Sequence, residues 1–160
     1  ARDKDACVAV MLLCEVAAYY KKYNMTLWDA MLAMYEKYGY YREGQQSITL
    51  KGKDGAASIR AMMDDARKNP SKELGGYQVY SISDYANDKK LLLATGETTS
   101  TGLPSSNVIY YELENDSWCC LRPSGTEPKI KFYYGVRGTS LEDSQKKLDE
   151  LGDAVMKLFS

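Results

Sequence analysis

Apolar side chains recur every three or four residues in four stretches of the chain, a spacing typical of helices with one buried face. The predicted helices are residues 5–23, 26–38, 54–69 and a C-terminal helix that follows residue 139. Thr26 with Asp29 has the spacing of a capping box, and Gly39 is a stop signal after that helix. Thr139 with Glu142 predicts a second capping box at the start of the last helix.

Residues 1–39 are therefore predicted to form a helical hairpin with a wide apolar surface. On its first helix Cys7 and Cys14 share a face, and we expect both to be buried. Because two helices enclose little core, the hairpin must pack on the rest of the chain or on a larger partner, and we favour a missing partner. We expect the isolated chain to self-associate through this hairpin or to re-dock it. A hinge is predicted near residues 38–46, where Gly39 and Gly44 interrupt the pattern.

Five shorter stretches either alternate between apolar and polar residues or are rich in β-branched and aromatic residues, as strands are. The predicted strands are residues 47–50, 77–84, 108–113, 117–121 and 129–136. Asn115-Asp116 is expected to form a tight turn between two of them, and residues 88–106 a long polar loop. The order of elements predicts an α+β fold, in which two helices cover one face of an antiparallel-rich sheet of four to five strands.

The composition excludes several classes of function. The chain has 160 residues, 44% of them hydrophobic, which is enough for one ordinary domain or a small domain with an appendage. Lys and Arg number 21 against 22 Asp and Glu, so the net charge of -1 provides no overall field for nucleic acid or an anionic membrane. The sequence has no histidine, which excludes Ser/His/Asp and Cys/His nucleophiles and histidine zinc sites.

The cysteines and the N-terminal region favour a cytoplasmic protein. The cysteines, which include the adjacent pair Cys119 and Cys120, have no C-x-x-C spacing, and we interpret them as reduced. The longest apolar run, residues 6–14, is well short of the roughly 20 residues that span a bilayer. Asp3 and Asp5 precede the first helix, where an N-cap role is favoured over a metal pair, so no metal ligands are predicted. Because the chain does not begin with Met, we expect it to be a piece of a longer protein.

The residues that join the last two predicted strands suit an oxyanion. Arg122 offers a planar fork of donors for a phosphate, and Ser124 and Thr126 add hydroxyl donors. Gly125 lacks a Cβ, which lets successive backbone N–H groups turn inward. Pro123 and Pro128, which flank the loop tip, are expected to stiffen it.

The charges around this loop predict a local anion site. Residues 121–137 carry Glu127 as their single acidic residue and four cations, Arg122, Lys129, Lys131 and Arg137. This leaves a local excess of positive charge in a slightly acidic chain, and Lys131 is expected to add to the phosphate field. The alternatives are a plain hairpin turn with Arg122 paired to a carboxylate such as Glu127, and a solvated strand face for the two lysines.

Three segments resemble the α-D-phosphohexomutases, in particular their phosphoglucomutase and phosphomannomutase branch. Residues 122–136 resemble the phosphate-binding loop and following strand of that family's C-terminal domain, and residues 101–108 and 47–53 resemble it less specifically. The resemblance covers essentially the whole chain. It implies that residues 40–160 form the C-terminal phosphate-binding domain, similar in fold to the TATA-binding protein, and that residues 1–39 end the third domain.

The resemblance also implies a function. Phosphohexomutases are isomerases of carbohydrate metabolism that move a phosphoryl group between O1 and O6 of a hexose through a bisphosphate. In this chain the resemblance assigns no catalytic residue and gives the substrate phosphate to Arg122, Ser124, Gly125, Thr126 and Lys131.

The partners and cofactors implied by the resemblance belong to the intact protein. The intact protein is expected to use Mg2+ and glucose 1,6-bisphosphate, whereas this chain alone is expected to bind neither and to be inactive. Its expected partners are a sugar phosphate and the missing N-terminal domains, with no nucleic acid and no membrane. Phosphomannomutase and a non-catalytic anion-binding module are the alternatives to phosphoglucomutase.

Overall fold

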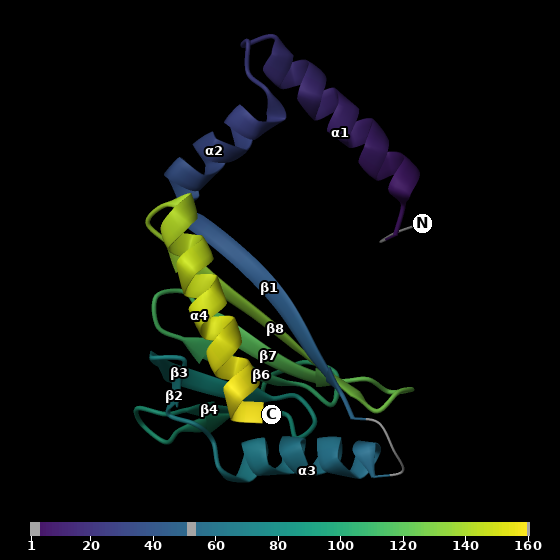
Figure 1. Ribbon diagram of the computed structural model, residues 1–160, viewed down its shortest axis with the longest axis vertical. Coiled ribbons are helices and arrows are strands. Elements are labelled where there is room, and N and C mark those ends of the chain that lie inside the picture. The colour runs from purple at the N-terminus through teal and green to yellow at the C-terminus, as the bar shows by residue number, and fades with distance from the viewer. Residues whose placement is uncertain (1–3, 51–53, 160) are drawn as a thin grey trace. The chain divides into compact units, whose positions relative to one another are not determined.

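A computed structural model describes residues 4–50 and 54–159 of the chain. It divides into two compact units, residues 1–40 and 41–160, which are described separately (Figure 1). Asp3, one half of the Asp-x-Asp pair, and residues 51–53 of one family-like segment lie outside the described residues.

The first unit is a pair of helices, α1 (Ala6–Lys21) and α2 (Leu27–Tyr38). Asp5 is the N-cap of α1, and its side chain accepts a hydrogen bond from the backbone N–H of Val8 at 3.0 Å, as the N-cap prediction requires. The capping box of Thr26 and Asp29 is also confirmed, because each side chain accepts the other residue's backbone N–H.

The predicted burial of α1 is wrong. None of its residues is buried, and Cys7 and Cys14 are exposed. Apolar spacing indicates which side chains share a face of a helix, but burial depends on what packs against that face. The exposed large apolar side chains of α1 are Val8, Val10, Met11, Leu12, Leu13, Val16 and Tyr19.

The second unit is an α+β layer, as predicted, with α3 (Gly55–Lys68) and α4 (Leu141–Phe159) beside one sheet (Figure 1). The strands, whose neighbours follow the order β1-β8-β7-β6-β3-β4-β5, are β1 (Tyr40–Thr49), β2 (Glu73–Leu74), β3 (Tyr77–Asp84), β4 (Lys89–Leu92), β5 (Thr98–Thr99), β6 (Ile109–Leu113), β7 (Trp118–Pro123) and β8 (Lys129–Gly138). β2 pairs with β3 off this path.

Both helices of this unit pack on the same face of the sheet. Ile59 and Met63 of α3 share one buried cluster with Leu151 and Val155 of α4. The strand side chains of this cluster alternate along the last three long strands: Ile109, Tyr111, Leu113, Cys119, Leu121, Ile130, Phe132, Tyr134 and Val136. Because successive side chains point to opposite faces, the residues between them form the other face of the sheet.

Over the described residues the sheet has eight strands, more than the four to five predicted. The predicted polar loop at residues 88–106 contains β4 and β5, and β1 begins at Tyr40 rather than Ser47. Gly44 therefore lies inside a strand rather than in a hinge, whereas Gly39, with φ of 112°, ends α2. These strands have polar or mixed sequences, and their pairing depends on distant partners rather than on local pattern.

A predicted turn and a predicted helix cap had different outcomes. Asn115 and Asp116 have φ of 57° and 56°, which fits the tight hairpin turn predicted between β6 and β7. The cap of α4 is displaced by one residue from the Thr139–Glu142 pair. Ser140 accepts the backbone N–H of Asp143 at 3.0 Å, and the Asp143 carboxylate accepts the N–H of Thr139 at 2.7 Å.

Candidate functional site

The predicted anion-binding loop is the tip of the β7–β8 hairpin. The antiparallel ladder continues through the pairs Arg122 with Lys131 and Pro123 with Ile130. The backbone N–H of Ser124 then donates to the carbonyl oxygen of Lys129 at 2.7 Å, which closes the loop. The tip, residues 124–128, is thus held at both ends by regular strands whose inner side chains are buried.

Two backbone donors of the tip are free. Among the described residues, no acceptor is found for the N–H of Gly125 or Glu127, whereas the N–H of Thr126 is 3.4 Å from the hydroxyl of Ser124. A Cβ on Gly125 would have no atom within 4 Å, and its φ is not in the left-handed region. Gly125 therefore leaves open space beside the free donors, and the loop does not need its special conformational freedom.

Three cations at this end of the hairpin have no carboxylate partner. Arg122 and Lys131 are register partners, so they lie on one sheet face, and Lys129 shares that face two residues from Lys131. Within residues 4–50 and 54–159, none of the three forms an ion pair or a side-chain hydrogen bond. The alternative, in which Glu127 neutralises Arg122, is therefore wrong.

The fourth predicted cation belongs elsewhere. Arg137 is at the opposite end of β8, and its Nη1 is 2.8 Å from a carboxylate oxygen of Asp116. Its guanidinium also lies over the ring of Tyr41, at 5.6 Å from the ring centroid. Arg137 thus adds nothing to the field at the loop, and the local charge comes from the three cations near the tip.

A pocket of about 300 Å³ opens on one side of the loop. Besides loop residues 123–128, it is lined by Ala56, Ile59 and Arg60 of α3 and by Asn107. Arg60 was not predicted, because nothing in the local sequence places α3 beside the loop. Asn107 belongs to the family-like segment 101–108, which was the available signal for it.

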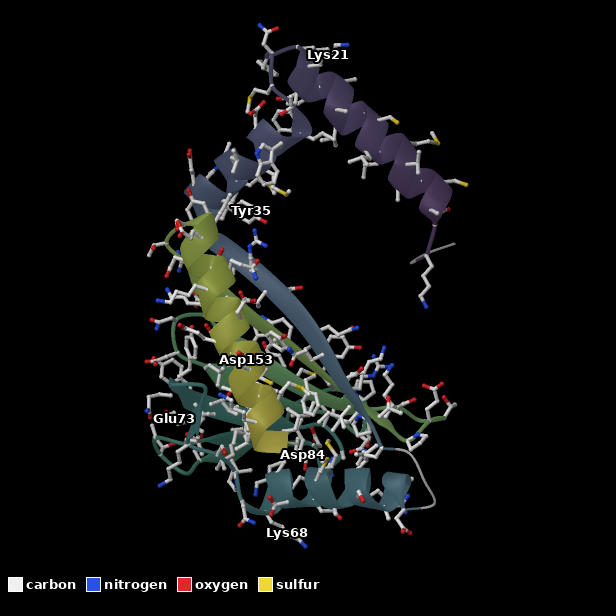
Figure 2. The ribbon with its side chains drawn as sticks, in the orientation of Figure 1. Lys21, Tyr35, Lys68, Glu73, Asp84 and Asp153 are labelled. Carbon is white, nitrogen blue, oxygen red and sulfur yellow. The ribbon has the colours of Figure 1, made fainter. Side chains whose placement is uncertain are left out.

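A half-buried ion pair contacts Asn107 in the wall of this pocket. Arg67 of α3 donates through Nε to both oxygens of Asp84, each at 3.2 Å, and Asp84 lies beside α3 in Figure 2. A second nitrogen of the Arg67 guanidinium donates to the side-chain oxygen of Asn107. These bonds join α3, the end of β3 and Asn107, which lies two positions before β6, so Asn107 is held in place.

The start of the connection between β5 and β6 is bound by one carboxylate from the turn between β3 and β4. Asp88 accepts hydrogen bonds from the hydroxyls of Ser100 and Thr101, at 2.7 and 2.6 Å, and from the backbone N–H of Thr101 and Gly102. The Thr101 and Ser100 hydroxyls are the main cause that lowers the pKa of Asp88 to about 2. The Asp88 carboxylate is thus ionised, and its oxygens accept these hydrogen bonds. Among the described residues it forms no contact with Arg122, Lys129 or Lys131.

The remaining candidate groups have ordinary structural surroundings. Cys119 is buried and Cys120 half-buried, on opposite sheet faces, and burial raises the pKa of both thiols. Among the described residues, no group of three or more acidic, cysteine or histidine side chains is placed to hold a metal ion. In residues 4–50 and 54–159 no helix combines the length and apolar character needed to cross a membrane.

Comparison with known proteins identifies sequence relatives of this chain. No protein-family model matches the chain. It is 37% identical over 150 residues to a phosphoglucomutase of Staphylococcus aureus strain bovine RF122, and 36% identical to that of strain USA300. Each match covers 94% of this chain and 27% of the relative. The chain therefore spans about a quarter of the length of these relatives.

A solved structure has the same fold. It is the exocytosis-sensitive phosphoprotein pp63/parafusin of Paramecium, described as a phosphoglucomutase in its open form. The match has a TM-score of 0.55 and 13% identity, and it covers 98% of this chain and 26% of that one. The fold and the sequence comparisons agree with the resemblance of the loop and its neighbouring segments. Nearly the whole chain is thus similar in sequence to about a quarter of these phosphoglucomutases, and similar in fold to about a quarter of the Paramecium protein.

Proposed function

We propose that this chain is the C-terminal, phosphate-binding part of a phosphohexomutase of the phosphoglucomutase type. In the intact enzyme it would hold the substrate phosphate that is not reacting while hexose 1-phosphate and hexose 6-phosphate interconvert through a bisphosphate. The observation that carries the proposal is the set of three cations without carboxylate partners, Arg122, Lys129 and Lys131, beside a rigid loop with two free backbone donors.

The loop offers several kinds of donor to one phosphate. The guanidinium of Arg122 can bind two phosphate oxygens at once, and Lys131 adds a point charge on the same sheet face. The hydroxyls of Ser124 and Thr126 and the N–H of Gly125 are donors at the tip. These groups recognise the shape and charge of a phosphate and little of the sugar. Such a site suits a reaction in which either phosphate of the bisphosphate must be held in turn.

The chemistry itself belongs to other parts of the intact protein. The described residues do not fit a Mg2+ site, since no cluster of carboxylates is placed to bind one. The resemblance implies a phosphoserine that donates the phosphoryl group and a loop that recognises the sugar, and both would lie in the three quarters of the relatives that this chain does not cover. We therefore expect this chain alone to bind sugar phosphate weakly, without Mg2+, and not to turn it over.

An amide-resolved NMR titration of the 160-residue chain tests the proposed site. Inorganic phosphate should shift the amide signals of residues 124–127, and Arg122→Ala should weaken this response about tenfold to a hundredfold. Arg137→Ala is the matched control, because Arg137 lies on the same hairpin but is paired with Asp116. Shifts spread evenly over the surface, or equal responses from both variants, would contradict the assignment.

A further inference from the structure

The sheet face that carries the free cations continues into aromatic side chains. On β8 this face holds Lys129, Lys131 and Tyr133 in succession, because every second residue points the same way. On β7, Arg122 lies opposite Lys131, and Cys120 lies opposite Tyr133. Tyr133 is therefore the first residue beyond the cations on this face, about 7 Å along the strand from Lys131.

The ring of Tyr133 is available to a ligand. It is half-buried, and within the described part of the chain it makes no ring contact and its hydroxyl forms no hydrogen bond. Two neighbouring tyrosines of this sheet already pack against other groups. Tyr110 stacks on Trp118 at 5.7 Å between ring centroids, and Tyr134 is 5% exposed on the helix face. Neither helix of the second unit covers Tyr133, since both pack on the opposite face.

We propose that Tyr133 is a stacking platform for the hexose ring of the sugar phosphate whose phosphate the loop holds. The inference rests on the proposed function, because the cations fix where the ligand begins. The spacing between Lys131 and Tyr133 is on the order of the distance between the phosphate and the ring of a hexose phosphate. Positive charge followed by a free aromatic face thus matches an anionic group followed by a sugar ring.

Stacking of this kind suits both substrate orientations. An aromatic ring packs against the C–H face of a sugar and does not depend on the order of its hydroxyl groups. Tyr133 can therefore support the ring whether the phosphate held by the loop is on O1 or on O6. It adds affinity for a phosphorylated sugar over a bare phosphate, and it leaves the choice between sugar epimers to other parts of the intact protein.

The test compares four probes on the 160-residue chain by NMR titration: inorganic phosphate, glycerol 3-phosphate, glucose 6-phosphate and glucose. Glucose 6-phosphate should bind about threefold to tenfold more tightly than the two phosphates that lack a ring. Tyr133→Phe should keep this preference, since it keeps the ring. Tyr133→Leu should abolish it and leave inorganic phosphate binding unchanged. Tyr80→Leu is the control, because Tyr80 is 59% exposed on β3 of the same sheet.

A second measurement uses only the wild-type chain, so it does not depend on whether the variants fold. In the wild-type chain, the ring signals of Tyr133 should shift with glucose 6-phosphate and not with inorganic phosphate. Failure of both phosphates to perturb residues 124–127 would overturn the proposed function and the platform with it. Equal affinities for glucose 6-phosphate and inorganic phosphate, with no shift of the Tyr133 ring, would overturn the platform alone and leave the phosphate site in place.

Discussion

Gly44 of β1 lies directly against the ring of Tyr134 on β8. A Cβ added to Gly44 would come within 2.7 Å of Cε2 of that ring, and a Cβ on Gly152 of α4 would come within 2.6 Å of the phenol oxygen. The Tyr134 ring thus fills the space between β1 and α4, and burial raises its pKa. Because neighbouring residues of a strand point to opposite faces, this contact also directs Tyr133 to the face that carries the cations.

The first prediction concerns this close contact. Gly44→Ala should lower the free energy of unfolding by about 1–3 kcal/mol, because the added methyl group has no room beside the Tyr134 ring. Urea denaturation followed by circular dichroism measures the change. Gly125→Ala is the matched control, since a Cβ there meets nothing within 4 Å. Equal stability of the two variants would contradict the tight packing between β1 and β8.

The second prediction concerns the ion pair between α3 and β3. The side chains of Arg67 and Asp84 are 18% and 14% exposed, so removing one partner leaves a charge in a poorly solvated place. Arg67→Ala should cost about 3 kcal/mol of stability. Arg60→Ala, on the exposed surface of the same helix, should cost little. A thermal or urea denaturation series with both variants checks this, and similar losses in both would show that the pair contributes nothing special.

Patterns of neighbouring residues predicted some of these features and could not predict others. The capping box of Thr26 and Asp29 and the turn at Asn115 need only neighbouring residues, and both are in the structure. The role of Gly44 was misread, because a glycine in a strand looks the same in sequence whether it bends the chain or admits a ring. The contact with Tyr134 joins residues ninety positions apart, and no local pattern contains it.

The features of the candidate site also differ in how far the sequence could predict them. Its loop residues follow one another in sequence, so their donors could be recognised from residue types alone. The neutralisation of Arg137 by Asp116, and the presence of Arg60 in the wall of the pocket, depend on how separate elements pack. The prediction that Cys7 and Cys14 are buried was wrong for the same reason, because helical spacing does not say whether another part of the protein packs against that face.

The third prediction concerns pH and the segment around Thr101. The pKa of Asp88 is lowered to about 2, first by the Thr101 hydroxyl, so the stabilisation it provides is present above the ordinary carboxyl pKa near 4. It should be lost as the pH falls toward 2. The amide signals of Thr101 and Gly102 should move in step with this titration in an NMR pH series. Asp88→Ala should remove the step, and an unchanged step in that variant would assign it to another group.

The fourth prediction concerns the first helix. Met11 and Leu12 of α1 are 72% and 58% exposed, and such neighbouring apolar side chains favour association in water. We expect the 160-residue chain to self-associate as its concentration rises, which sedimentation velocity measures. Met11→Glu combined with Leu12→Glu should shift the chain toward monomer, whereas Met11→Leu should not. A monomer at all concentrations in the wild-type chain would exclude association through this helix.

The last prediction concerns the guanidinium at the loop in the intact enzyme. A charged hydrogen bond to phosphate contributes about 1.5–3 kcal/mol, so Arg122→Ala should raise KM for the sugar phosphate about tenfold to a hundredfold. Arg122→Lys should recover part of this loss, because it restores the charge but not the bidentate geometry.

The matched control for this prediction is again Arg137→Ala, which removes the same guanidinium from the far end of the hairpin where Asp116 already neutralises it. Steady-state kinetics of the three variants separate a phosphate ligand from a general effect of positive charge on the hairpin. If the two alanine variants raise KM equally, the hairpin acts through its net charge and Arg122 has no special contact. If neither does, the free cations of this face do not bind the substrate phosphate, and the function proposed for the loop is wrong.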